Sequence, residues 1–100
     1  MDTSPDYPTE EMKSLYKAIL TLKTADEAAR FFRDLLTEAE IKEFSNRWQM
    51  VQMIAKGISY LDIAKSLGVS TTTVNRCAKW LHNGMGGYKL VLKRCKKSVF

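Results

Sequence analysis

The chain has 100 residues, of which 45% are hydrophobic, and its formal net charge is +5. A chain of this length folds as one domain and buries only about 60–65% of its unfolded surface, so a partner subunit would supplement its thin core. The sequence has no signal-peptide pattern and no apolar run of about 20 residues, which argues against a secreted or membrane-spanning protein. Its two cysteines lack metal-ligand spacing, and we expect a soluble, cytoplasmic protein with free thiols.

Charge is distributed unevenly along the chain. Residues 1–43 contain ten acidic and six basic side chains, a net of −4. Residues 44–100 contain a single acid, Asp62, and ten bases, a net of +9. A basic excess concentrated in one half of a small protein favours a polyanionic partner such as nucleic acid.

The spacing of apolar residues predicts six helices and no strands. The first helix begins near Thr9, and T-x-x-E sequences at residues 24–27 and 37–40 form capping boxes for the second and third. The third helix is the longest and runs to about Lys56. Its inward-facing residues are predicted to be Ile41, Phe44, Trp48, Val51 and Ala55.

Three shorter helices follow in the basic half. Ser59 and Ser70 are the predicted N-caps of the fourth and fifth helices. A glycine-rich segment, residues 84–87, separates the fifth helix from a sixth that ends in the basic run 93–97. The predicted fold class is therefore all-α.

Residues 59–81 have the pattern of a helix-turn-helix. This motif needs a small residue where its helices cross, a glycine in the turn, and apolar residues that hold the second helix on the first. Ala64 is the small residue where the helices cross, and Gly68 is the glycine of the turn. Val69 fills the corner between the two helices. The second helix then has a predicted buried stripe at helical spacing, made of Val74, Cys77, Ala78 and Leu81.

The polar side of that second helix is the candidate DNA-binding surface. Ser70 caps the helix, and its first turn holds three threonines, which are poor helix formers but can contact phosphates, base edges and thymine methyl groups. Asn75 has the amide needed for a bidentate pair with adenine, and Lys79 is placed for a phosphate. The predicted DNA-binding residues are Ser70, Thr71, Thr72, Thr73, Asn75, Arg76 and Lys79.

Nothing in the sequence indicates an enzyme. His82 has no carboxylate or cysteine nearby in sequence, and no phosphate-binding glycine motif or metal-ligand cluster occurs. We therefore expect no catalytic residue, no metal and no cofactor.

From about Leu35 to Leu81 the chain resembles the tryptophan repressor (TrpR) family, and in particular its Gram-positive TrpR-like branch of the YerC/YecD type. The parts of the chain that resemble the family are the segment LLTEAEIKEFSNRWQMVQMIAKG and the helix-turn-helix that follows it. The resemblance implies one domain over residues 1–100, with dimerisation helices at about 9–56 and 87–97 and a helix-turn-helix at about 59–82. It also implies an intertwined homodimer with two heads about one DNA turn apart, which would read a palindromic operator through the helix at 71–82.

The resemblance also implies an effector pocket between the third and fifth helices. Thr37, Arg47 and Arg76 match pocket positions of the repressor, where the two arginines flank the indole and hold the carboxylate of tryptophan. Three positions depart from the pattern, because Asp34 replaces a leucine, Cys77 a glycine and Trp80 a serine. We expect Trp80 to pack over Arg76 in the place of the ligand, or alternatively to point into the core beside Leu81.

The resulting expectation is a repressor-like regulator that free tryptophan does not control, while any other effector stays unknown. Two alternatives remain open. One is a DNA- or replication-associated binding module without a regulatory ligand, since this type of helix-turn-helix also resembles the one that ends the bacterial replication initiator. The other is an interaction protein in which the motif only supports dimerisation.

Overall fold

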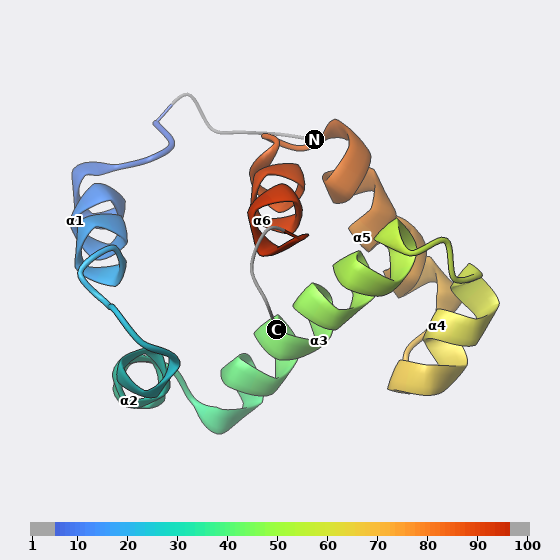
Figure 1. The fold of residues 1–100 in the computed structure, drawn as a ribbon, viewed down its shortest axis with the longest axis horizontal. Helices are drawn as coiled ribbons and strands as arrows, with labels where there is room; N and C mark the ends of the chain where they lie inside the picture. The colour runs from blue at the N-terminus through green and yellow to red at the C-terminus, as the bar shows by residue number, and fades with distance from the viewer. Residues whose placement is uncertain (1–5, 97–100) are drawn as a thin grey trace. The chain divides into compact units, whose positions relative to one another are not determined.

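The computed structural model describes residues 6–96 and consists there of six α-helices without strands (Figure 1). The helices are α1 (Glu10–Ile19), α2 (Ala25–Leu35), α3 (Glu38–Ala55), α4 (Tyr60–Leu67), α5 (Thr71–Asn83) and α6 (Gly87–Lys96). The prediction of an all-α chain is confirmed. Contacts divide the chain into two compact units that separate within α3, after residue 42. No helix among residues 6–96 is both long and apolar enough to cross a membrane.

Side-chain caps begin the helices of the N-terminal unit. Thr37 and Glu40 form a reciprocal capping box: the Thr37 hydroxyl accepts from the Glu40 N–H at 3.1 Å, and the Glu40 carboxylate accepts from the Thr37 N–H at 2.9 Å. These hydrogen bonds lower the pKa of Glu40. At α2 the box is only half formed, because Thr24 accepts from the Glu27 N–H while the Glu27 carboxylate accepts from the N–H of Lys23.

The N-terminal unit has no buried residue within its described part. The helices α1 and α2 are amphipathic, but their apolar sides are only half-buried or exposed: Met12 is 39% exposed, Tyr16 38% and Leu35 47%. The rings of Phe31 and Phe32 lie edge to face, with centroids 5.5 Å apart. Two helices with this little burial do not form a core by themselves.

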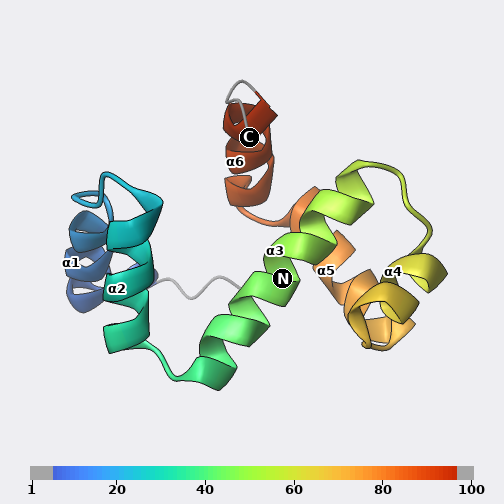
Figure 2. The same cartoon turned by 60° about the horizontal axis from the view of Figure 1, so that its bottom comes forward.

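The hydrophobic core lies in the C-terminal unit, where α4 and α5 pack against the second half of α3 (Figures 1 and 2). Three side chains, one from each helix, are completely buried: Val51 of α3, Ile63 of α4 and Val74 of α5. The other buried residues are Met50, Ala64, Cys77, Ala78 and Leu81. The core is therefore the helix-turn-helix and the end of the helix before it.

The predicted inward side of α3 is partly wrong. Val51 is buried and Trp48 packs against the core, but Phe44 is 48% exposed and Ala55 is exposed. For Phe44 the physical reason is that the core cluster begins further along α3, where Met50 and Val51 are buried against α4 and α5. A single stripe of helical spacing does not reveal where along a helix its neighbours lie.

Candidate functional site

The turn between α4 and α5 has the geometry of a helix-turn-helix. Gly68 ends α4 in the left-handed region, with φ +66° and ψ +36°, a conformation that costs a glycine little. The N–H of Val69 donates to the carbonyl oxygen of Ala64 at 3.0 Å, which closes the turn. Ser59 caps the start of α4 by accepting from the Asp62 N–H at 3.1 Å.

The predicted apolar stripe of α5 is the side that packs on α3 and α4. Val74, Cys77, Ala78 and Leu81 are between 0% and 9% exposed. With these four positions in the core, the opposite side of α5 must face away from the protein. The packing thereby fixes which α5 side chains a partner can reach.

Two of the seven predicted DNA-binding residues form the cap of α5. The Ser70 hydroxyl accepts from the Thr73 N–H at 3.1 Å, and the two hydroxyl oxygens lie 3.0 Å apart within hydrogen-bonding distance. Thr73 is half-buried, unlike the two threonines before it. Its place in the sequence is therefore explained by capping as well as by any contact with DNA.

The other five predicted residues are exposed and have no hydrogen-bonding or ion-pair partner within residues 6–96. They are Thr71, Thr72, Asn75, Arg76 and Lys79. By contrast, three arginines elsewhere are paired with carboxylates: Arg30 with Asp26, Arg33 with Glu38 and Arg47 with Glu43. The exposed side of α5 thus offers two hydroxyls in its first turn, near the positive end of the helix dipole, and an amide and two cations in the turns that follow.

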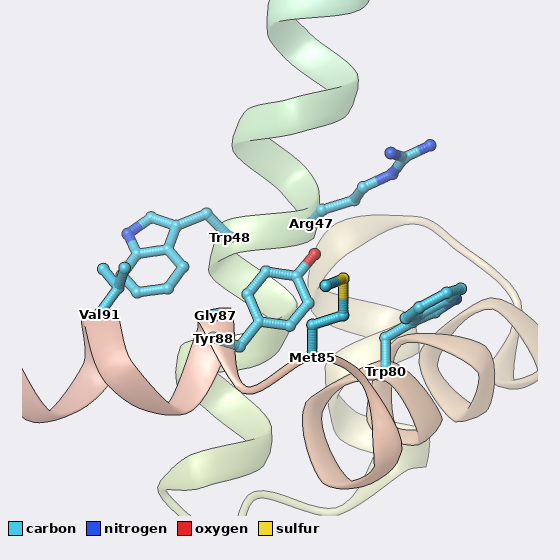
Figure 3. A pocket seen from close by; sticks show the side chains of 7 residues that line it. All are labelled: Arg47, Trp48, Trp80, Met85, Gly87, Tyr88 and Val91. Carbon is cyan, nitrogen blue, oxygen red and sulfur yellow. The ribbon is translucent and has the colours of Figure 1, made fainter. Parts of the chain in front are cut away.

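An open pocket lies next to α5 (Figure 3). Its volume is about 540 Å³, within the range of small-molecule sites. The lining residues come from α3, α5, the following turn and α6, and they are Arg47, Trp48, Trp80, Met85, Gly87, Tyr88 and Val91. Apart from Arg47 and the Tyr88 hydroxyl, the wall is apolar.

Trp80 forms one wall of this pocket and does not fill it. Its side chain is 41% exposed and neither packs over Arg76 nor points into the core beside Leu81. Among the described residues the cation–π contact is that of Arg47 with Phe44, at 5.8 Å from the ring centroid. Gly84 is the C-cap residue that follows α5, and its N–H donates to the Trp80 carbonyl oxygen at 2.9 Å.

The predicted effector residues are only partly brought together. Arg47 and Trp80 line the pocket, whereas Arg76 does not. Cys77 is buried, and its thiol donates to the Arg47 carbonyl oxygen at 3.8 Å. Burial raises the pKa of Cys77, an effect that the nearby Arg47 charge partly opposes. The remaining two residues belong to the N-terminal unit, where Thr37 caps α3 and Asp34 is exposed on α2.

Four side chains of the pocket were not predicted as site residues: Trp48, Met85, Tyr88 and Val91. Tyr88 is half-buried, and burial, followed by the nearby Cys77, raises the pKa of its hydroxyl. Tyr88 and Val91 stand three positions apart in the sequence, which is helical spacing, and this spacing was the available signal. Met85 precedes α6 in the glycine-rich turn and has no periodic neighbour that could have indicated its role.

Comparison with known proteins gives consistent matches along the chain. The family model described as Trp repressor protein matches residues 10–96. The chain is 35% identical over 89 residues to the uncharacterized protein YerC of Bacillus subtilis (strain 168), and the match covers 89% of this chain and 86% of that protein.

Two solved structures have the same fold. A TrpR-like protein from Eubacterium eligens superposes with a TM-score of 0.84 at 38% identity, covering 93% of this chain and 96% of that one. A proposed Trp repressor from Staphylococcus aureus superposes with a TM-score of 0.80 at 36% identity, covering 90% of both chains.

Proposed function

Since this chain belongs to the Trp repressor family, a family of DNA-binding regulators, we propose that it is a sequence-specific regulator of transcription that reads duplex DNA through α5. The observation that carries the proposal is the row of five exposed α5 side chains without a partner in the described chain. They lie on a helix whose opposite side is locked in the core. A surface of unpaired polar groups on a rigid helix suits the major groove.

Each of these side chains has a chemical role in the proposed complex. Thr71 and Thr72 would contact phosphates or thymine methyl groups, and the Ser70-capped N-terminus would approach a phosphate. Asn75 would pair with adenine through both groups of its amide, which gives sequence preference. Arg76 and Lys79 would bind phosphates and so contribute affinity that depends on salt.

We also propose that the active species is a homodimer with a palindromic operator. The support is the exposed apolar surface of the helices expected to dimerise: α1, α2 and α6 contain no buried residue. A 100-residue chain with its core confined to the helix-turn-helix gains stability from a partner subunit. Two heads related by twofold symmetry would then bind two half-sites about one DNA turn apart.

Free tryptophan is not the effector in this proposal. Two arginines would have to hold a tryptophan carboxylate, but only Arg47 lines the pocket, and its guanidinium is engaged by Glu43 at 2.7 Å. Trp80 places an indole on the pocket wall, and the buried Cys77 thiol contacts the Arg47 carbonyl oxygen at 3.8 Å. Calorimetric titration with millimolar tryptophan tests this: saturable heat together with tighter DNA binding would contradict it.

The function is tested by letting the purified protein select fragments of its own genomic DNA. We expect enrichment of a palindromic sequence, and binding that weakens steeply as salt rises. A Lys79→Ala variant should weaken binding on all sequences and reduce the salt dependence by about one phosphate contact. Sites at promoters support a regulator, sites at a replication origin support the replication-associated alternative, and no selected DNA would contradict both.

A further inference from the structure

One row of side chains on α5 points directly away from the core. The inner side of the helix is defined by its buried residues, which are Val74, Cys77, Ala78 and Leu81. At 3.6 residues per turn, successive residues are about 100° apart around the axis, so Thr72, Arg76 and Lys79 lie within about 30° of the line opposite those four. All three are exposed, and we call them the outer ridge. Asn75 is also exposed but lies about 70° to one side of that line.

Arg76, in the middle of the outer ridge, has an unused guanidinium. It has no ion-pair or hydrogen-bonding partner within residues 6–96, whereas Arg30, Arg33 and Arg47 are each paired with a carboxylate. Neither α5 nor α6 contains an acidic residue that could engage it. The five N–H donors of Arg76 are therefore free to bind a partner outside the chain.

The shape of the guanidinium favours one kind of partner in the major groove. Guanine presents two neighbouring acceptors there, O6 and N7, and the planar fork of arginine can donate to both at once. A phosphate needs only a positive charge, which Lys79 already provides on the same ridge. Arg76 is the one arginine of α5, so it is the side chain of this helix best matched to guanine.

The position of Arg76 along α5 also suits a base contact. Thr72 lies in the first turn, and Arg76 lies one turn later, about 6 Å further along the axis. A helix that enters the groove by its N-terminus carries its later turns away from the base edges, so a second-turn residue needs a long side chain to reach them. The outer ridge has this gradation, with a short threonine first and a long arginine after it.

We propose that Arg76 reads a guanine in each half-site of the operator, donating two hydrogen bonds to O6 and N7. The inference rests on the DNA-reading function proposed above and adds a specificity-determining residue to it. Only two of the five donors are used, so the others can still bind a neighbouring phosphate. Each half-site should therefore contain a required G·C pair in addition to the A·T pair read by Asn75.

A cycle of protein and base substitutions tests this pairing. The protein variants are Arg76→Ala and, as the matched control, Lys79→Ala, which also removes one cation from the outer ridge. Circular dichroism checks that both variants are folded. The DNA is the selected operator, a random duplex, and a set of operators in which one guanine per half-site is replaced by 7-deazaguanine, which lacks the N7 acceptor. All dissociation constants are measured at one salt concentration.

We expect the preference of Arg76→Ala for the operator over random DNA to fall about 5- to 100-fold, while Lys79→Ala loses affinity equally on both. At one guanine position, 7-deazaguanine should weaken wild type and Lys79→Ala at least about fivefold and Arg76→Ala less than about twofold.

Three results would overturn the inference alone: an operator without a required guanine, no position sensitive to 7-deazaguanine, or a penalty that persists in Arg76→Ala. In each of these cases sequence-selective binding leaves the proposed function intact. Failure of the protein to select any DNA sequence would overturn the proposed function and this inference together.

Discussion

Shortening Val74 to alanine tests whether the recognition helix is held by its buried side. Val74 has no exposed surface and packs in one cluster with Val51 and Ile63. The substitution removes two methyl groups, each worth about 0.8 kcal/mol of transfer free energy. With the cost of the cavity left behind, we expect the free energy of unfolding to fall by about 2–3 kcal/mol.

The assay is urea denaturation followed by far-ultraviolet circular dichroism, at one fixed protein concentration because dimerisation contributes to stability. Thr72→Ala is the matched control, since Thr72 is exposed on the same helix. Its free energy of unfolding should stay within about 0.5 kcal/mol of wild type. A Val74→Ala protein as stable as the control would refute the packing argument.

Three further predictions concern other parts of the chain. A Gly84→Ala protein should lose about 1–3 kcal/mol of free energy of unfolding in the same assay, because the new β-carbon would collide with the Trp80 carbonyl oxygen and lie 3.1 Å from the Trp80 ring. A Gly84→Ala protein as stable as wild type would contradict this. Burial raises the pKa of Cys77, so a thiol reagent at neutral pH should label Cys95 before Cys77, and equal labelling rates would contradict this. The contribution of the protonated Cys77 thiol to the free energy of unfolding should be lost as pH rises above the unfolded-state thiol pKa of about 8.5. Hydrogen bonds with Thr37 lower the pKa of Glu40. The carboxylate therefore contributes to the free energy of unfolding above its unfolded-state pKa, and this contribution is lost as pH falls through the folded-state pKa. In a Glu40→Gln variant the free energy of unfolding should fall less steeply as the pH is lowered, and an unchanged slope would contradict this.

Local signals predicted the helices and the motif well. Thr37 with Glu40, Ser59 and Ser70 act as caps where the sequence indicated them, and Gly68 takes the left-handed conformation the turn requires. These features depend on residues within four positions of one another, so a sequence contains all the information for them.

The pocket and the exposed side of α3 depend on long-range packing and could not be predicted in the same way. Whether Phe44 is covered depends on which helix crosses α3 at that turn, and periodicity does not specify this. Met85 and Tyr88 reach the pocket because the glycine-rich turn brings α6 back toward α3 and α5. Trp80 stands where the repressor has a pocket serine and was expected to take the place of the ligand, yet its side chain forms a wall of the pocket.

The most direct test of the central claim compares two asparagines of α5. Asn75 lies on the exposed face proposed to read bases, and Asn83 is exposed at the other end of the helix. Binding of Asn75→Ala and Asn83→Ala proteins to the selected operator and to random duplex DNA is measured at one salt concentration. We predict that Asn75→Ala loses about 1–3 kcal/mol on the operator and much less on random DNA, while Asn83→Ala binds both like wild type. Equal losses for Asn75→Ala on both DNAs, or none, would contradict sequence reading through α5.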